Sequence, residues 1–436
     1  MKNRNRRRQS SPKPLGPIRE YTITGLTHDA KGVARIEGKV SFIEGALPGE
    51  VVEAQVVKPG KNYDLASLKR LISHSDDRIE APCKHYAVCG GCSFQHLAPA
   101  PQIDAKHQWL SGQLRKVIED QPIEVLSDRD FAYRRRARIA VIATEGKTTL
   151  GFRGRGSNRI VAIDNCIVLT EPLQQLYGKL KDKIIADPLA SKLGHIELLE
   201  DNQGISLLFR LIETVSPDLK KQWQTWAQTV NADLYWQDAA SSRAEVEEGQ
   251  LRHYLLDGMS LRYHPQDFIQ VNANMNNKMV ALAMMWLAPN KQDVVLDLFC
   301  GVGNFSLPLA KRAKQVIGVE VQESMVAAGR YNAQQNGLVN LSFIAADLSQ
   351  AVADEFSQFG VTKILLDPPR AGAKEFLETI VAINPQQILY VSCDAATLAR
   401  DAEYLVSKGF EVLRVTMMNM FPQTSHVETM MLLQRK

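Results

Sequence analysis

The chain has 436 residues, 45% of them hydrophobic and 23% charged, and its 52 Lys and Arg exceed its 48 Asp and Glu to give a net charge of +4. This length allows two or three domains with buried cores. No apolar run approaches the ~20 residues of a membrane-spanning helix, and the basic N-terminus lacks the apolar core of a secretory signal, so we expect a cytoplasmic protein without membrane contact. In that compartment the six cysteines are expected to be reduced, metal-bound or catalytic rather than disulfide-paired.

The N-terminal part of the chain is basic. Residues 1–72 hold 14 Lys and Arg against 7 Asp and Glu, so the remainder of the chain sums to −3. Such an asymmetry favours a polyanionic partner, nucleic acid in particular, although the run KNRNRRR (2–8) is also typical of a tail that only adds solubility. We expect residues 1–16, which are basic, polar and interrupted by proline, to form a disordered tail.

Residues 17–73 contain five short β-rich stretches separated by glycine and proline turns. This spacing predicts a small β-barrel of the oligonucleotide-binding (OB-like) kind. Lysines and arginines interleaved along these strands suit contact with a nucleic-acid backbone. A small barrel that binds no ligand is the alternative.

Residues 74–262 begin with the cluster CKHYAVCGGCSFQH, in which Cys83, Cys89 and Cys92 are spaced C-x5-C-x2-C. Cys166, which has no other assigned role, could supply the fourth thiolate of a metal site. Zinc and an iron–sulfur cluster both accept four cysteines, so the spacing leaves the metal open. We expect an amphipathic helix over 101–119, an arginine-rich β-like run over 131–142, and mixed α and β structure without a recognisable motif over 171–260.

Residues 263–436 alternate strands with helices, which predicts a mostly parallel sheet with helices on both faces, as in Rossmann-like domains. The apolar strand VVLDL runs into FCGVGNF, where Gly301 and Gly303 allow the backbone to approach a ligand. Glu320 ends the next predicted strand, where a carboxylate can hold ribose hydroxyls, and Asp347 ends the third, where it can meet an adenine amino group. A nicotinamide dinucleotide is the rival cofactor at this point.

The sequence DPPR (367–370) favours S-adenosylmethionine as the cofactor. In methyltransferases that use this donor, a loop of this kind after the fourth strand faces both the methyl donor and the acceptor. Two prolines stiffen the loop and fix the direction of Asp367, although a structural turn would also explain them.

A thiol and a carboxylate complete the pattern. Cys393 ends the apolar run ILYVSC, and Glu428 lies in SHVET near the C-terminus. Pyrimidine C5 is a poor nucleophile until a thiolate adds to C6, and a base must then remove the C5 proton before the thiolate can leave. We expect the helix that begins near Ala396 to lower the pKa of the Cys393 thiol. Cys300, within the cofactor loop, is expected to be a packing residue.

Together, VLDLFCGVGNFSL, LLDPPR, YVSCD and SHVET resemble the bacterial RNA uracil-5-methyltransferases, and the resemblance extends from about residue 17 over nearly the whole chain. The cysteine cluster and the basic barrel narrow it to the branch that acts on 23S ribosomal RNA and carries an iron–sulfur cluster, in which the barrel is called a TRAM domain. The transfer RNA enzymes of the family normally lack the four cysteines, and the other 23S enzyme lacks the barrel.

The resemblance implies a role for each matching residue. Cys393 would be the nucleophile and Glu428 the base. The S-adenosylmethionine site would comprise Gln270, Phe299, Asn304, Glu320, Asp347 and Asp367. A structural [4Fe–4S] cluster would be held by Cys83, Cys89, Cys92 and Cys166. Positions associated with the RNA substrate would be Phe268, Arg134, Arg135, Arg136 and Arg138.

The expected protein is a monomeric three-part enzyme: a TRAM barrel over 17–73, a central α+β iron–sulfur domain over 74–262, and a Rossmann-like α/β methyltransferase domain over 263–436. It would methylate C5 of one uridine of 23S ribosomal RNA, flipped out of a remodelled loop, with no protein partner. A non-catalytic iron–sulfur RNA-binding protein is the alternative from another class, but it would have no use for Cys393 and Glu428.

Overall fold

The computed structural model describes residues 15–119, 121–144, 146–348, 356 and 358–436, so the predicted tail over 1–16 lies almost wholly outside the described residues. The chain forms two compact units. The first comprises the residues up to Pro82 together with Ser93–Trp109, and the second comprises Cys83–Cys92 and Leu110–Lys436. Among the described residues, no helix combines the length and the apolar character that a membrane span requires.

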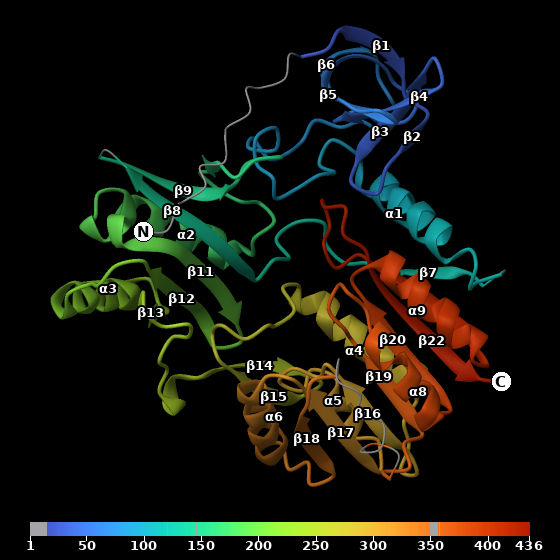
Figure 1. Cartoon of the computed structure of the whole chain (residues 1–436). Helices are drawn as coiled ribbons and strands as arrows, with labels where there is room; N and C mark the ends of the chain where they lie inside the picture. Colours follow the sequence, from blue (N-terminus) through green and yellow to red (C-terminus); the bar gives the residue numbers. More distant parts are fainter. Residues whose placement is uncertain (1–14, 120, 145, 349–355, 357) are drawn as a thin grey trace, which may run out of the picture. The chain divides into compact units, whose positions relative to one another are not determined.

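The first unit is built on a curved six-stranded sheet, drawn in blue in Figure 1. Its strand order is β1-β5-β6-β4-β3-β2. Alternate residues of β5, such as Val52 and Ala54, are fully buried and pack with Ile43 and Ala66, which is the period-two pattern of a strand with one face on a core. The strands are β1 (Ile18–Thr22), β2 (Gly25–Leu26), β3 (Lys31–Ile36), β4 (Lys39–Glu44), β5 (Val51–Pro59) and β6 (Tyr63–Ser73). The predicted small β-domain is therefore confirmed, with one strand more than expected.

Helix α1 (Pro99–Leu114) begins in the first unit and ends in the second, where the sequence predicted a helix over 101–119. The second unit contains a six-stranded central sheet with strand order β10-β9-β8-β11-β12-β13. Its elements are β8 (Arg136–Thr144), β9 (Lys147–Arg153), β10 (Ile160–Ala162), α2 (Glu171–Ile185), η1 (Pro188–Lys192), β11 (Leu193–Asp201), β12 (Gly204–Leu211), α3 (Pro217–Thr229) and β13 (Ala232–Gln237).

One face of the central sheet forms a core with the helices. Ile139 of β8 and Phe209 of β12 pack in one cluster with Leu176 and Leu180 of α2 and with Trp223 of α3. The alternate residues of the strands therefore point to the other face, away from α2 and α3.

A hairpin follows the central sheet and leads to the C-terminal sheet. It consists of β14 (Arg252–Leu256) and β15 (Met259–Tyr263), after the short helix η2 (Glu248–Gln250). Arg252, only 2% exposed, donates from Nε to Asp201 Oδ2 at 2.9 Å and also forms an ion pair with Asp233. The Tyr263 hydroxyl donates to the same carboxylate of Asp201. One buried arginine thus ties the hairpin to the ends of β11 and β13.

The C-terminal sheet has eight strands in the order β18-β17-β16-β19-β20-β22-β21-β7. The first five are parallel, β22 is antiparallel to both β20 and β21, and β7 pairs in parallel with β21. The strands are β7 (Ile123–Leu126), β16 (Val294–Leu298), β17 (Gln315–Glu320), β18 (Leu341–Ala345), β19 (Lys363–Leu366), β20 (Gln387–Ser392), β21 (Phe410–Met418) and β22 (Glu428–Arg435). The predicted mostly parallel sheet is confirmed, but its edge strand β7 comes from far upstream in the chain.

Helices cover both faces of this sheet. Leu389 and Val391 of β20 pack in one cluster with Met279 and Ala283 of α4, whereas the hydroxyl of Tyr390, between them, donates to Asp401 of α9 at 2.8 Å. Figure 1 shows α4 on one side of the strands and α8 and α9 on the other. The helices are α4 (Ala273–Leu287), α5 (Ser306–Ala310), α6 (Glu323–Gln335), η3 (Lys374–Phe376), α8 (Leu377–Ile383) and α9 (Ala395–Ser407).

Replacement of Arg252 by methionine is expected to destabilise the second unit by about 3–5 kcal/mol, because Asp201 would remain buried without its cation. Chemical denaturation followed by tryptophan fluorescence measures the change. Lys192→Met is the control, since the partner carboxylate of Lys192, Glu213, is 58% exposed, and its loss should cost under about 0.5 kcal/mol. A loss of under about 1 kcal/mol for Arg252→Met would contradict the assigned role.

Candidate active site

The predicted site residues gather at one edge of the C-terminal sheet because its parallel strands end there. Glu320 is the last residue of β17, Asp367 directly follows β19, and Cys393 directly follows β20. Strand β22 runs the opposite way, and its first residue, Glu428, therefore lies at the same edge. The register pairs Ser392 with Thr429, so the residues next to this pair, Cys393 and Glu428, are neighbours.

The loop between β16 and α5 has a backbone that few residues tolerate. Phe299, Gly301 and Gly303 have φ values of 62°, 57° and 101°. A side chain at Gly303 would collide with Leu307 and approach the ring of Phe343 to 3.2 Å. The loop therefore depends on glycine both for its turn and for the close packing of α5 against the sheet.

Glu320 already holds this loop. Its Oε2 accepts from the backbone N–H of Gly301 at 3.2 Å, and its Oε1 accepts from the N–H of Gln322 at 3.0 Å. The carboxylate thus lies directly beside the glycine turn, where a ligand's hydroxyl groups could exchange with these backbone donors. Asp347, two residues beyond β18, is exposed at the same edge of the sheet.

Asn304 joins the loop to two other elements. Its Oδ1 accepts from the Tyr254 hydroxyl at 3.1 Å and from Asn276 Nδ2 at 2.9 Å, and its own Nδ2 donates to Asn276 Oδ1 at 3.0 Å. Gln270 lies just before α4, and its backbone carbonyl accepts from Arg135 Nε at 2.8 Å. The loop, the hairpin and the start of α4 are therefore held together by polar side chains.

Two further carboxylates lie in the floor of the site. Burial raises the pKa of Asp367 to about 7. Burial also raises the pKa of Asp297, in β16, to about 7, although the hydroxyl of Ser306 donates to its carboxylate. Cys300 belongs to the hydrophobic core around α4 and β17, as expected of a packing residue.

Cys393 and Glu428 interact through their charges. Burial, followed by the negative charges of Glu428 and Asp367, raises the pKa of the Cys393 thiol to about 11. Burial and the charge of Asp367 raise the pKa of Glu428, 9% exposed, to about 8. The guanidinium of Arg370 opposes both shifts. One thiol, two carboxylates and one arginine thus form a single electrostatic group.

The expectation of a lowered thiol pKa was wrong, and the helix cap explains why. Asp394 is the N-cap of α9, and its Oδ1 accepts from the N–H groups of Ala396 and Thr397 at 3.1 and 3.0 Å. The carboxylate therefore takes the helix donors that could have stabilised a thiolate. Cys393 precedes the cap, so burial and its two acidic neighbours raise the pKa of its thiol instead.

The loop that carries Arg370 is fixed from behind. Asp401, fully buried in α9, accepts from the N–H of Ala373 at 2.8 Å and from the hydroxyl of Tyr390 at 2.8 Å. Gly372, at φ 80°, leaves the space that this carboxylate occupies. Sequence reasoning gave neither Arg370 nor Asp401 a role. The fourth position of the DPPR motif could have indicated Arg370, but no local signal marks Asp401, Tyr254 or Asn276.

The residues predicted to meet RNA divide into two groups. Phe268 is 66% exposed, and Arg134 is partly buried with its Nε donating to the carbonyl of Arg136 at 2.9 Å. Arg135 is 5% exposed and stacks on Tyr254 at 5.1 Å, and Arg136 forms an ion pair with Glu197 at 2.8 Å and donates to the carbonyl of Pro265 at 3.0 Å. In this structure Arg135 and Arg136 hold the segment before α4 rather than face solvent.

The four cysteines of the predicted metal site come from two segments that meet in the second unit. Arg155 joins them to the central sheet by donating to the carbonyls of Tyr86 and Cys92 at 3.0 and 2.9 Å. Burial and the neighbouring thiols of Cys92, Cys89 and Cys83 raise the pKa of Cys166 to about 12. Within the described ranges, however, no three His, Cys, Asp or Glu residues are grouped closely enough to hold a metal ion.

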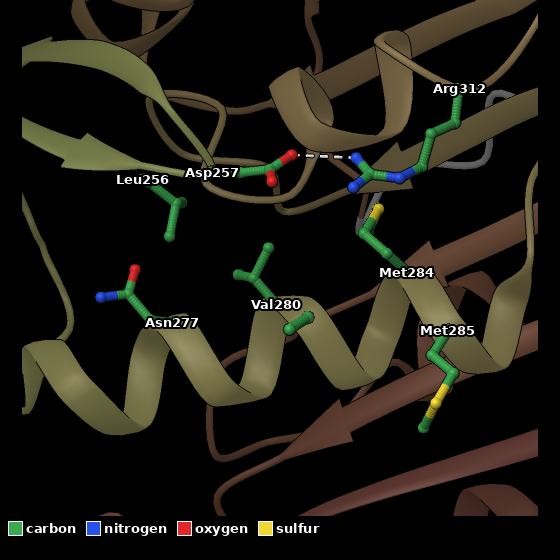
Figure 2. Close-up of a pocket in the computed structure, with 8 residues that line it drawn as sticks. Leu256, Asp257, Asn277, Val280, Met284, Met285 and Arg312 are labelled. Atoms are coloured by element: carbon green, nitrogen blue, oxygen red, sulfur yellow. Dashed lines mark hydrogen bonds and ion pairs between the residues drawn. The ribbon is translucent and has the colours of Figure 1, made fainter.

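A cavity of about 550 Å³ lies elsewhere, between α4 and the turn of the β14–β15 hairpin (Figure 2). Its rim carries the ion pair between Arg312 and Asp257 at 2.9 Å, and its lining includes Val280, Met284 and Met285 of α4. None of the predicted catalytic or cofactor residues lines it, so this cavity is separate from the candidate site.

Comparison with known proteins agrees with this geometry. Residues 99–436 match the family tRNA (Uracil-5-)-methyltransferase, and residues 14–69 match the TRAM domain. The protein 23S rRNA (uracil(1939)-C(5))-methyltransferase RlmD of Marinomonas sp. is 59% identical over 427 residues, which cover 98% of this chain and 97% of that protein. The protein of the same name from Aeromonas hydrophila is 42% identical over 423 residues, with 96% of each chain covered.

A solved structure has the same fold over nearly its whole length. The crystal structure of Pyrococcus abyssi tRNA (uracil-54, C5)-methyltransferase in complex with S-adenosyl-L-homocysteine superimposes with a TM-score of 0.76 at 25% identity, covering 95% of this chain and 99% of that one. With a family model matching most of the chain and relatives matching almost all of it, the chain belongs to the RNA uracil-5-methyltransferase family and carries a TRAM domain.

Proposed function

We propose that this protein methylates C5 of a uridine in 23S ribosomal RNA, the uridine numbered 1939 in the names of its relatives, with S-adenosylmethionine as methyl donor. The observation that carries the proposal is the pairing of Ser392 with Thr429, which brings a thiol and a carboxylate together at the edge of a methyltransferase sheet. A protein that only bound RNA would have no use for this pair. Because its proposed substrate is ribosomal RNA, we expect the protein in the cytoplasm. We propose that it acts as a monomer.

The cofactor site is proposed to comprise the six residues around the glycine turn. S-adenosylmethionine supplies an electrophilic methyl group there. Glu320 would hold the ribose hydroxyls in place of its present backbone donors, and Asp347 would meet the adenine amino group. Asn304 and Gln270 would bind the remaining polar groups, and Phe299 would support the ligand from the strained turn. Asp367 would face both donor and acceptor.

The chemistry is proposed to run through Cys393 and Glu428. The Cys393 thiolate adds to uracil C6, and the electron pair that moves to C5 takes the methyl group. Glu428 then removes the C5 proton, the C5–C6 double bond re-forms, and the Cys393 sulfur leaves as thiolate. The target base has to leave its stack to reach the thiol, and the exposed Phe268 and the partly buried Arg134 are proposed to receive it.

At neutral pH both groups rest in their protonated forms. A thiol with a pKa of about 11 is almost entirely un-ionised at pH 7, and a carboxyl with a pKa of about 8 is mostly protonated. The free site therefore holds little thiolate at pH 7. Substrate binding therefore has to lower the pKa values of both groups. Arg370 is the one cation described within the group that already favours their charged forms.

We propose further that Cys83, Cys89, Cys92 and Cys166 hold a [4Fe–4S] cluster with a structural role. Support comes from the mutual electrostatic influence of the four thiols and from Arg155, which fixes two carbonyls of the first segment. A single zinc ion would need all four sulfurs around one atom, whereas each thiolate of a [4Fe–4S] cluster binds a different iron and the sulfurs stand farther apart. The metal and sulfide content of the protein distinguishes these two kinds of site.

Incubation with 23S ribosomal RNA and methyl-labelled S-adenosylmethionine is expected to give one labelled 5-methyluridine. Cys393→Ala should lower the rate by a factor of at least about 10³, while the affinity for S-adenosylhomocysteine stays the same. Glu428→Gln should accumulate an RNA–protein adduct that survives denaturing gels, because elimination is blocked. Glu411→Gln, on β21 at the far end of the same strand pair, is the matched control and should form none. Label on transfer RNA alone would support the same reaction on a different RNA substrate. Full activity of Cys393→Ala would refute the covalent step.

Alkylation of Cys393 by iodoacetamide, followed by peptide mass mapping, should accelerate about tenfold per pH unit from pH 7 to pH 10, because the thiolate fraction grows in that proportion below a pKa of about 11. Glu428→Gln removes a charge that raises this pKa, so alkylation at pH 9 should be faster than in the parent protein. Glu411→Gln should leave the profile unchanged. A slower reaction in Glu428→Gln would show that the carboxylate does not act on the thiol.

Protein purified without oxygen should contain about four irons and four sulfides per chain. Cys166→Ser should lower both contents, whereas Cys300→Ser, which changes a core thiol outside the cluster, should not. Zinc without sulfide in the parent protein would show that the four cysteines hold a zinc ion and not an iron–sulfur cluster.

A further inference from the structure

The outer face of the central sheet carries a row of basic side chains from four adjacent strands. Arg138 of β8 lies beside His195 of β11, with guanidinium and imidazole nitrogens 3.4 Å apart. His195 is paired in register with Arg210 of β12. On the other side, the pairing of Ala140 with Gly151, continued by two residues, places Arg153 of β9 opposite Arg138. With neighbouring strands ~4.8 Å apart, the row is about 15 Å long.

This row faces away from the helices. The residues that alternate with it, such as Ile139 and Phe209, belong to the core formed with α2 and α3. Arg138 and Arg153 are exposed, and His195 and Arg210 are partly exposed. The cations are therefore on the open side of the sheet and not part of its core.

The row has an excess of positive charge. Glu197, on the same face of β11, forms ion pairs with Arg210 at 2.8 Å and with Arg136 at 2.8 Å. In the described part of the chain, neither Arg138 nor Arg153 forms an ion pair with a carboxylate. A cationic row along a sheet, with one carboxylate for several arginines, is complementary to a chain of regularly spaced negative charges.

We propose that the row Arg153–Arg138–His195–Arg210 binds the sugar–phosphate backbone of the substrate RNA at a distance from the reacting base. This inference rests on the proposed function and adds to it a surface for the RNA flanking the target nucleotide. Guanidinium groups suit this role because they bind phosphate oxygens by two parallel hydrogen bonds. Such contacts set the register of the RNA without reading its sequence.

His195 gives the surface a second property. Its pKa is lowered by partial burial and by Arg138, Arg210 and Arg153, against the opposing charge of Glu197. A phosphate placed on the row would add negative charge beside the imidazole and raise this pKa again. RNA binding at this face should therefore take up a proton at pH values between the lowered pKa of the free protein and the higher pKa of the complex, and affinity should rise as the pH falls through this range.

The test compares the salt dependence of binding to a labelled 23S ribosomal RNA transcript for the parent protein and for Arg138→Gln/Arg153→Gln. The backbone carbonyl of Arg153 accepts from the N–H of Gly90 in the cysteine segment at 2.9 Å, and the guanidinium donates to Asn158 Oδ1 at 3.5 Å. The substitutions therefore remove charge without removing the backbone contact to the cysteine segment. At low salt the affinity should fall about tenfold, and the slope of log K against log salt should decrease by about 1–2.

Two matched variants complete the experiment. Lys179→Gln/Lys221→Gln removes two exposed charges from α2 and α3, on the opposite face, and should change the affinity less than about twofold. Arg138→Lys/Arg153→Lys keeps the charge and should keep the slope. An unchanged slope in Arg138→Gln/Arg153→Gln would overturn the proposed surface, as would an equal loss in the control pair.

Methylation by the parent protein is measured on the same transcript. Normal methylation together with an unchanged slope would reject the surface alone. No methylation by the parent protein would reject the proposed function, while the slope would still decide whether this face binds RNA.

Discussion

The antiparallel insertion of β22 between β20 and β21 is the constraint on which the site depends. In a wholly parallel sheet, only the carboxyl ends of strands meet at the ligand edge, so a residue at the start of a strand, such as Glu428, would lie at the opposite edge. By reversing direction, β22 starts where β20 ends, and the pairing of Ser392 with Thr429 fixes Glu428 beside Cys393. Both groups are thus held by the hydrogen-bond ladder of the sheet, which is far stiffer than a loop.

The same burial that fixes these groups also disfavours their charged forms. Glu428 and Asp367 have folded-state pKa values of about 8 and 7, above the usual 4.5 and 3.8. The protonated forms therefore favour the folded state, a contribution that is fully present below about pH 4 and is lost as the pH rises through 7 and 8. Near neutral pH the site gives up part of the protein's stability to keep two carboxyl groups and a thiol close together. A base that works at neutral pH requires a carboxyl pKa raised in this way, and the lost stability is the consequence.

The sequence predicted those parts of the fold that depend on local pattern. Alternating strands and helices identified the Rossmann-like sheet, and residues at predicted strand ends, such as Glu320 and Asp367, do meet at one edge. Features set by long-range pairing were not predictable: β7 joins the sheet from almost 300 residues upstream of its partner β21. The acidity of Cys393 was misjudged because a helix start was considered without its cap, and Asp394 takes the donors that a thiolate would have needed.

The arginine run before and within β8 illustrates why residue type alone could not assign roles. Arg135 turns inward to the carbonyl of Gln270, and Arg136 is neutralised by Glu197. Arg138, opposite Glu197 in register, forms no ion pair with a carboxylate of the described residues and is exposed on the open face. Arg136 and Arg138 lie on the same face of β8, but Glu197 and the carbonyl of Pro265 bind Arg136, whereas the side chain of Arg138 is exposed. One basic segment can therefore both anchor the segment leading to α4 and present charge to solvent. Position in the sheet decides which arginine stabilises the protein and which is available to a polyanion. The central sheet thereby connects the support of the cofactor loop with a surface suited to RNA.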